Sequence, residues 1–212
     1  MISLTLLLLA ANVVVYLMTV GPDGVLRPEV AWTYGLYAAN LAHRPSCLIT
    51  YMFLHAGPVH LLFNLLGLLT FGLQLERLLS PVEYLLLYFA SGVAGGLLQV
   101  AVTPDVPVVG ASSAIFGLLG CLTMLRPMSV IMFFLVPMPL VLFSVLYALA
   151  AVLVIESGKF TNVAHAGHLG GMVVGGGLAL LYRPREALRG LVAVTVVLVL
   201  LLVGYRLVVG SP

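Results

Sequence analysis

Residues 106–125 read VPVVGASSAIFGLLGCLTML and contain no charged side chain. Their apolar residues are continuous and do not alternate with polar ones, as they would along a half-buried β-strand. The stretch is therefore typical of a helix in an apolar environment. Such a helix needs no hydroxyl groups, yet Gly110, Ser112 and Ser113 stand where it begins. These residues either help helices to pack closely or take part in chemistry.

The rest of the chain has the same apolar character. Hydrophobic residues make up 62% of the 212 residues and charged residues only 8%, whereas a soluble domain carries about 25% charged residues. The formal net charge of +2 is too small to indicate a nucleic-acid partner. Between the charged residues lie apolar runs that can cross the roughly 30 Å hydrocarbon core of a bilayer. We expect seven such runs, at about residues 2–20, 52–75, 82–103, 111–126, 129–155, 165–182 and 188–209.

These runs predict helices, because every backbone polar group in lipid must be hydrogen-bonded within the protein. The predicted fold class is an all-α polytopic membrane protein. Residues 2–20 lack the basic segment of a signal peptide and exceed its usual apolar length, so we expect a retained first helix. Residues 21–50 are the one long connection between the predicted helices, and long connections are often functional.

The distribution of arginine indicates the orientation of the helices. Arg183, Arg185 and Arg189 cluster between the last two predicted helices. Short loops rich in Lys and Arg usually lie on the cytoplasmic side, which puts the N-terminus inside and the C-terminus outside. The second, fourth and sixth predicted helices then all begin at the outer face of the membrane.

Unusual polar residues lie near the outer ends of these three helices. The second helix offers HAGPVHLLFN at 55–64, the fourth GASSAIFG at 110–117, and the sixth AHAGHLGGMVVGGG at 164–177. Each group lies within one or two helical turns of the outer face, at a common depth on the order of 10 Å. The polar side chains concerned are His55, His60, Asn64, Ser112, Ser113, His165 and His168.

Each of these residues has a structural explanation when taken alone. A membrane serine often packs as a small residue between helices, and His168 could be hydrogen-bonded to a neighbouring carbonyl. His60 and Asn64, four residues apart on one helical face, could simply join two helices. Together the groups favour a functional site, because polar groups inside a membrane are costly and usually functional. Hydroxyl, imidazole and amide are also the groups that acyl transfer needs.

The spacing on the sixth helix indicates how a hydroxyl and an imidazole meet. Serine is a poor nucleophile until a base takes its proton, and histidine is a suitable base. Gly171 and Gly175 follow His168 at i+3 and i+7 and share its face. Glycine there lets this helix approach the fourth helix, so that His168 can reach Ser112.

Other residues supply the remaining parts of such a site. Phe116, one turn after Ser112, can pack against the imidazole. The tetrahedral intermediate needs donors for its oxyanion, and the candidates are the Asn64 amide, the His60 ring and the backbone N–H of Ser112. All seven acidic residues lie in loops or at the ends of the predicted helices, so we expect a Ser–His dyad. The same distribution argues against an H-E-x-x-H metalloprotease and an aspartyl protease, and no metal or cofactor is expected.

The chain resembles the rhomboid family of intramembrane serine proteases in three motifs, which occur in the right order on alternate helices. They are HAGPVHLLFNLLGLL at 55–69, GASSAIFGLLG at 110–120 and AHAGHLGGMVVG at 164–175. The resemblance covers about residues 44–182. It implies a six-helix catalytic core within 1–184, followed by a connecting loop and a seventh transmembrane helix in 185–212.

By motif position, the resemblance implies Ser112 as nucleophile and His168 as general base, with His60 and Asn64 in the oxyanion hole. It implies hydrolysis of peptide bonds in or next to transmembrane segments, with single-span transmembrane proteins as substrates. We expect the protein in a prokaryotic cytoplasmic membrane, with the site open to the outer side. The sequence leaves the oligomeric state open.

The chain departs from the family pattern at three places. Ser113 stands where many relatives have glycine, and Phe116 where many have tyrosine. Ser46 and Cys47 replace a frequent Trp-Arg pair, so nothing is inferred about the placement of the loop at 21–50.

Two other functions remain as alternatives. A catalytically inactive rhomboid-like binding or trafficking factor would share the fold, but such members lack the serine or the histidine that this chain retains. A transporter or channel would be expected to have internal repeats with paired broken helices, and no motif of this sequence occurs twice.

Overall fold

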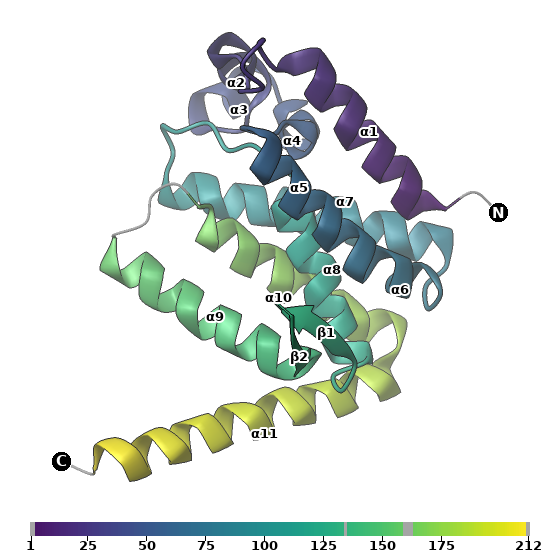
Figure 1. Ribbon diagram of the computed structural model, residues 1–212, viewed down its shortest axis with the longest axis vertical. Coiled ribbons are helices and arrows are strands. Elements are labelled where there is room, and N and C mark those ends of the chain that lie inside the picture. The colour runs from purple at the N-terminus through teal and green to yellow at the C-terminus, as the bar shows by residue number, and fades with distance from the viewer. Residues whose placement is uncertain (1–2, 134, 159–162, 211–212) are drawn as a thin grey trace.

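The computed structural model describes residues 3–133, 135–158 and 163–210, and most of them are helical (Figure 1). This confirms the predicted helical class. The helical stretches among these residues that are long and apolar enough to cross a membrane are Pro58–Glu76, Pro81–Val102, Leu140–Ser157 and Pro184–Val208. Two shorter apolar helices are Leu4–Thr19 and Ser112–Leu125. The predicted number of seven crossing helices therefore stays a prediction.

Three helices pack side by side at the centre of the molecule (Figure 1): α7 (Pro81–Val102), α8 (Ser112–Leu125) and α10 (His165–Tyr182). Glycine makes this packing possible. A Cβ atom on Gly171 of α10 would collide with the carbonyl oxygen of Ser113 on α8. One on Gly175 would collide with the carbonyl oxygen of Gly117. The two backbones therefore touch directly, as in membrane helix pairs with small residues at the interface.

Two helical stretches pack against each other beside this centre: α1 (Leu4–Thr19), and a continuous stretch of α5 (Pro58–Gly67), the π-helical turn η2 (Leu68–Gly72) and α6 (Leu73–Glu76). Pro58 occupies the first position of α5, where its missing N–H is no loss. The Glu76 carboxylate accepts hydrogen bonds from the Ser3 hydroxyl (2.8 Å) and the Leu4 backbone N–H (2.7 Å). The end of α6 is thereby joined to the start of α1, where the helix dipole also favours a carboxylate.

The long connection at 21–50 is folded into short helices at one end of the molecule (Figure 1): α2 (Pro28–Tyr34), α3 (Ala38–His43) and α4 (Cys47–Thr50), followed by the 3-10 turn η1 (Tyr51–Phe53). Backbone hydrogen bonds between Leu36 and Val108 join it to the segment before α8. Cys47 is fully buried. The connection is thus packed next to the beginning of α8.

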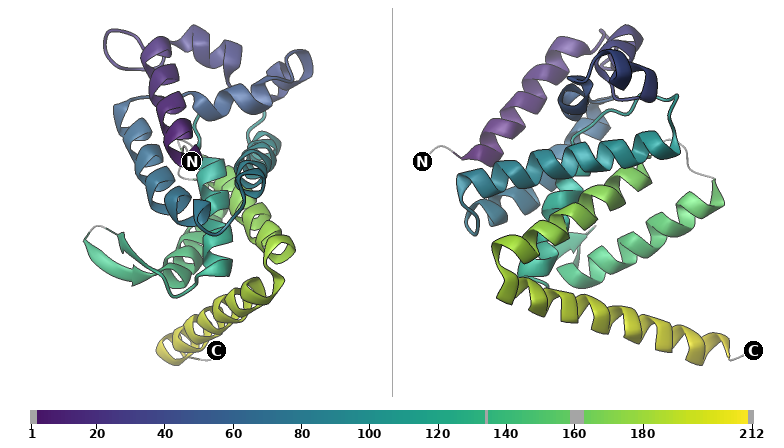
Figure 2. Two further views of the ribbon diagram at one scale, coloured as in Figure 1. Left: turned by 90° about the vertical axis from the view of Figure 1, so that its right-hand side faces the viewer. Right: turned by 180° about the vertical axis from the view of Figure 1, so that it is seen from behind.

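The helix predicted to begin at residue 129 begins at residue 140 instead, so this part of the prediction was wrong. The residues before it form an antiparallel hairpin: β1 (Val130–Phe133) and β2 (Val136–Pro139). Pro137 and Pro139 explain the difference, because proline lacks an N–H donor and disfavours helical backbone at the residue before it. α9 (Leu140–Ser157) follows directly. Figure 2 (left) shows the hairpin projecting from the side of the bundle.

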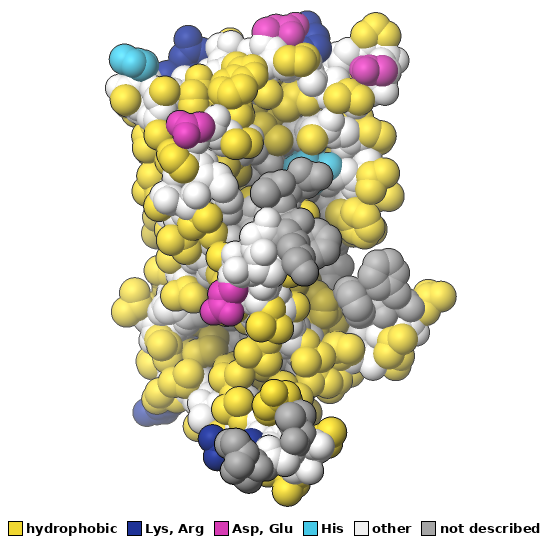
Figure 3. All heavy atoms as spheres, turned by 90° about the vertical axis from the view of Figure 1, so that its left-hand side faces the viewer, with side chains coloured by type: hydrophobic (Ala, Val, Ile, Leu, Met, Phe, Trp, Pro, Cys, Tyr) yellow, Lys and Arg dark blue, Asp and Glu magenta, His cyan; other side chains and the backbone are white. Residues whose placement is uncertain are grey.

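The last helix, α11 (Pro184–Val209), lies at the opposite end of the molecule from α2–α4 (Figure 1). Many of its apolar side chains are exposed. Figure 3 shows hydrophobic side chains covering much of one side of the molecule, with arginine at its two ends and acidic side chains at one end and part-way along it. The extensive apolar surface suits a bilayer, because polar groups are costly in its interior. The predicted division into residues 1–184 and 185–212 stays a prediction.

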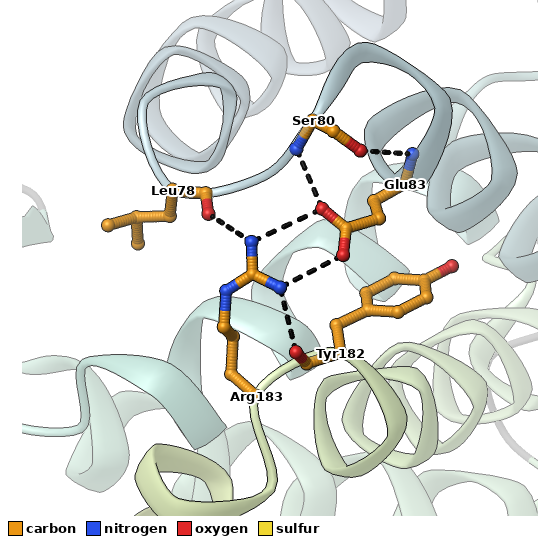
Figure 4. A network of polar contacts seen from close by, with 5 residues as sticks. All are labelled: Leu78, Ser80, Glu83, Tyr182 and Arg183. Atoms are coloured by element: carbon orange, nitrogen blue, oxygen red, sulfur yellow. Dashed lines mark hydrogen bonds and ion pairs between the residues drawn. The ribbon is translucent and has the colours of Figure 1, made fainter.

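A polar network joins the α10–α11 turn to the start of α7 (Figure 4). Arg183 donates hydrogen bonds to the Glu83 carboxylate (2.9 Å) and to the Leu78 carbonyl (3.1 Å). Glu83 also accepts from the Ser80 backbone N–H (2.7 Å), while the Ser80 hydroxyl accepts from the Glu83 N–H. This reciprocal cap satisfies two N–H groups that a helix start leaves unpaired.

Candidate active site

Ser112 and His168 lie within hydrogen-bonding distance of each other. Ser112 is the first residue of α8, and His168 stands in the first turn of α10. Their Oγ and Nε2 atoms are 2.8 Å apart. The direct contact of the two backbones at Gly171 sets this distance, since a larger residue there would push the helices apart. The geometry suits a hydroxyl facing its general base.

Phe116 orients the imidazole. Its ring lies one turn after Ser112 and stacks on His168, with the ring centroids 4.3 Å apart and the ring planes inclined by 12°. His168 is only 8% exposed. The imidazole is therefore enclosed, and the stacked phenyl ring restricts rotation out of its plane.

Tyr147 of α9 contacts the other nitrogen of His168, and sequence reasoning missed it. Its Oη atom lies 2.6 Å from Nδ1 of His168. Its ring centroid lies 4.3 Å from that of Phe116. Only a carboxylate was expected as a third group, although a phenol can occupy the same place. The available signal was a single tyrosine in the otherwise apolar stretch 145–155, VLYALAAVLVI.

His60 presents a hydrogen-bond donor near Ser112. Its Nδ1 accepts a hydrogen bond from the backbone N–H of Ala56 (3.3 Å), which puts the proton of the neutral ring on Nε2. That Nε2 lies 2.8 Å from where a Cβ atom on Gly110 would stand. Glycine is required at this position, both for the space and for its φ of +119°.

Asn64, one turn further along α5, is buried. One N–H of its amide donates to the His60 carbonyl in the same helix (2.8 Å). A primary amide has two N–H groups. Among the residues that the structure describes, the second N–H of Asn64 has no hydrogen-bond partner, so it can bind a ligand. An oxyanion hole needs such fixed donors.

One cavity of about 690 Å³ is lined by Ser112, His168, His60 and Asn64 together. This volume lies in the range of ligand sites, roughly 300–1,000 Å³. Most of its wall is apolar and comes from α5, α8 and the segment before α8, including Val59, Phe63, Val106, Val108 and Ile115. The cavity therefore suits an apolar segment that presents a polar backbone group to the serine.

Gln99 of α7 also lines this cavity, and sequence reasoning missed it too. Its Oε1 accepts a hydrogen bond from the backbone N–H of Gly167 (3.0 Å). Because Gly167 precedes His168, this bond anchors the start of α10 beside the imidazole. A single amide in the apolar run 82–103 was the signal that could have found it.

The other two histidines of the motifs stand beside the site. The ring of His55 meets that of His60 edge-on, with centroids 5.2 Å apart. The ring centroid of His165 lies 6.2 Å from that of His168. Among the described contacts, neither His55 nor His165 bonds to Ser112.

The chain is similar to known proteins over most of its length. The family model described as Rhomboid domain matches residues 42–185. The chain is 28% identical over 178 residues to rhomboid protease GluP of Bacillus subtilis, covering 82% of this chain and 33% of that protein. It is 34% identical over 134 residues to rhomboid-like protease 3 of Toxoplasma gondii, covering 63% and 50%. A shorter match, 33% over 75 residues, is to inactive RHOMBOID-like protein 8 of Arabidopsis thaliana and covers 35% and 21%.

The chain thus spans between a third and a half of the length of the first two relatives. The matched domain takes up more than half of the chain and contains all three motifs. Together with the apolar helices, it identifies an integral membrane protein and confirms the resemblance found in the sequence. The chain belongs to the rhomboid family.

Proposed function

We propose that this chain is an intramembrane serine endopeptidase that uses Ser112 and His168 as a catalytic dyad. The observation that carries the proposal is the 2.8 Å contact between Ser112 Oγ and His168 Nε2 at the wall of the cavity. Rhomboid relatives named as proteases support hydrolysis at the level of the family.

The reaction would follow from this geometry. His168 Nε2 takes the hydroxyl proton as Ser112 Oγ attacks the scissile carbonyl carbon. The oxyanion that forms accepts hydrogen bonds from His60 Nε2–H and the Asn64 amide. His168 then gives its proton to the leaving nitrogen, which leaves an acyl-enzyme. A water molecule, deprotonated by the same imidazole, hydrolyses that ester and restores Ser112.

The substrates in this proposal are single-span transmembrane proteins. A helix buries each of its carbonyl groups in an internal hydrogen bond, so the scissile segment must leave the helix to meet Ser112. Glycine and proline weaken a helix by roughly 1 and 3 kcal/mol relative to alanine. We therefore expect such residues next to the bond that is cut.

The proposal includes a membrane topology. The short helices α1 and α8 and the glycine-rich α10 would cross the bilayer together with the four long stretches, giving a six-helix core and α11 as the seventh helix. The N-terminus would be cytoplasmic and Ser112 would open toward the outer side, as the arginines of the α10–α11 turn suggest. A prokaryotic cytoplasmic membrane remains the expected location.

The second candidate function is that of a catalytically inactive rhomboid-like factor, because one relative is named inactive. An inactive factor has no need for a serine and an imidazole at hydrogen-bonding distance, which makes this candidate the weaker one.

Cleavage of a single-span test substrate in detergent or liposomes tests the proposal. The wild-type protein should release two fragments, and Ser112→Ala should release none. Ser113→Ala is the matched control, since it removes the neighbouring hydroxyl and should keep cleavage. Equal cleavage by wild type and Ser112→Ala, or none by wild type, would favour another function.

A further inference from the structure

Tyr147 occupies the place that a carboxylate has in a catalytic triad. Its Oη atom lies 2.6 Å from His168 Nδ1, on the side of the imidazole that Ser112 does not contact. We infer that Tyr147 is a positioning residue that fixes the tautomer and the orientation of His168 for catalysis. The inference rests on the proposed function and extends the predicted dyad by a third group.

The tautomer that catalysis requires of His168 defines a role for Tyr147. A general base must offer a lone pair, so the neutral imidazole must have Nε2 free to accept the Ser112 proton. The single ring proton is then on Nδ1, and Nδ1–H donates to Tyr147 Oη. With the opposite tautomer, Nε2–H would point at the serine and no proton could be taken up. In this reactive form the phenol oxygen is the acceptor that satisfies Nδ1–H.

The same contact becomes stronger during the reaction. When His168 accepts the serine proton, the imidazole becomes a cation with an N–H on each nitrogen. The Nδ1–H···Oη bond is then charge-assisted, and such bonds are stronger than neutral ones. An interaction that strengthens toward the transition state raises kcat rather than lowering KM.

The hydroxyl of Tyr147 is held in position by its surroundings. Its ring packs against Phe116, which in turn stacks on His168. One turn earlier on α9, the Ser144 hydroxyl is hydrogen-bonded to Thr123 of α8 (2.6 Å). Because α8 also carries Ser112 and Phe116, α9 is fixed to the helix that carries the nucleophile.

A purely structural role for the Tyr147 hydroxyl predicts different results from a catalytic one. A half-buried phenol in an apolar environment needs a hydrogen-bond partner in any case, and His168 would serve. Tyr84 provides the matched control, because its buried hydroxyl joins α7 to Thr5 of α1 (2.9 Å). Tyr84→Phe removes a hydrogen bond between two helices without touching His168.

The first test is the rate of substrate cleavage. Tyr147→Phe should lower kcat by about 3- to 30-fold, as loss of one hydrogen bond to a group that becomes charged would do, with KM nearly unchanged. Tyr84→Phe should keep kcat. Wild-type kcat in Tyr147→Phe, or an equal loss in both variants, would overturn the inference.

The second test observes the imidazole directly and needs no activity. In protein labelled with ¹⁵N-histidine, the signals of His168 are assigned by their loss in His168→Asn. Wild type should have the proton on Nδ1, and Tyr147→Phe should have a mixture of tautomers. Unchanged nitrogen shifts in Tyr147→Phe, or a proton on Nε2 in wild type, would refute the role of Tyr147. Persistent cleavage by Ser112→Ala would instead refute the proposed function.

Discussion

The helices α8 and α9 hold His168 in different ways. α8 touches α10 through its backbone, at glycines that leave no room for a side chain. α9, at the edge of the bundle in Figure 1, reaches His168 through one long aromatic side chain. The first contact sets the distance between serine and imidazole, and the second sets the state of the imidazole. The rigid contact should tolerate no change, whereas the side-chain contact should be adjustable.

Breaking the backbone contact should have the largest effect. Gly171→Ala puts a Cβ atom into the Ser113 carbonyl, so α8 and α10 must separate and His168 must move away from Ser112. Overpacking of this kind costs about 1–3 kcal/mol of folding stability. We expect a lower Tm and cleavage below detection.

Gly177→Ala is the control on the same helix, because nothing lies within 4 Å of its added Cβ atom. It should leave both Tm and cleavage near the wild-type values. If Gly171→Ala behaves like Gly177→Ala, the backbone contact does not set the catalytic distance.

Removing a hydrogen-bond donor of α5 should have the second-largest effect on cleavage. Asn64→Ala removes a proposed oxyanion donor and should lower kcat by roughly 10- to 1000-fold. It should leave some reactivity toward a serine-directed probe, since Ser112 and His168 keep their contact. Cleavage kinetics and probe labelling measured on one preparation check both statements.

Asn12→Ala is the matched variant for this comparison. The Asn12 amide is also buried and donates to the carbonyl four residues earlier, that of Leu8 (2.7 Å), but it lies on α1. Full activity in Asn64→Ala, or an equal loss in Asn12→Ala, would remove Asn64 from the oxyanion hole.

Loosening α9 should have the smallest effect. Ser144→Ala removes the hydrogen bond to Thr123, which is worth about 0.5–1.5 kcal/mol. The hydroxyl of Tyr147 then becomes less well placed, and we expect kcat to fall only about 2- to 5-fold. Thr195→Ala removes a hydroxyl that bonds within α11 and should have no effect. A loss as large as that of Asn64→Ala would mean that α9 is part of the rigid core.

Local periodicity explains what the sequence could predict. Gly171 and Gly175 were expected on the face of His168 because helical spacing alone puts them there, and the structure has them against α8. Ser112, His60 and Asn64 were found because they belong to short motifs. Their placement around one cavity agrees with that expectation, while their catalytic roles stay predictions.

Features that depend on tertiary contacts were not predictable in the same way. Tyr147 belongs to no motif, and its helix was expected to begin at residue 129. Pro137 and Pro139 were the signals for a later start, but an apolar run alone does not separate a strand from a helix. The helices within 21–50 are joined to the bundle by bonds such as those between Leu36 and Val108, which no local pattern encodes.

The most direct measurement of the central claim is the position of a covalent adduct. A fluorophosphonate probe reacts with a serine that a neighbouring base activates. Mass spectrometry of the labelled protein should find the adduct on Ser112, and His168→Ala should lose most of the labelling. An adduct on Ser113, or undiminished labelling in His168→Ala, would contradict the account.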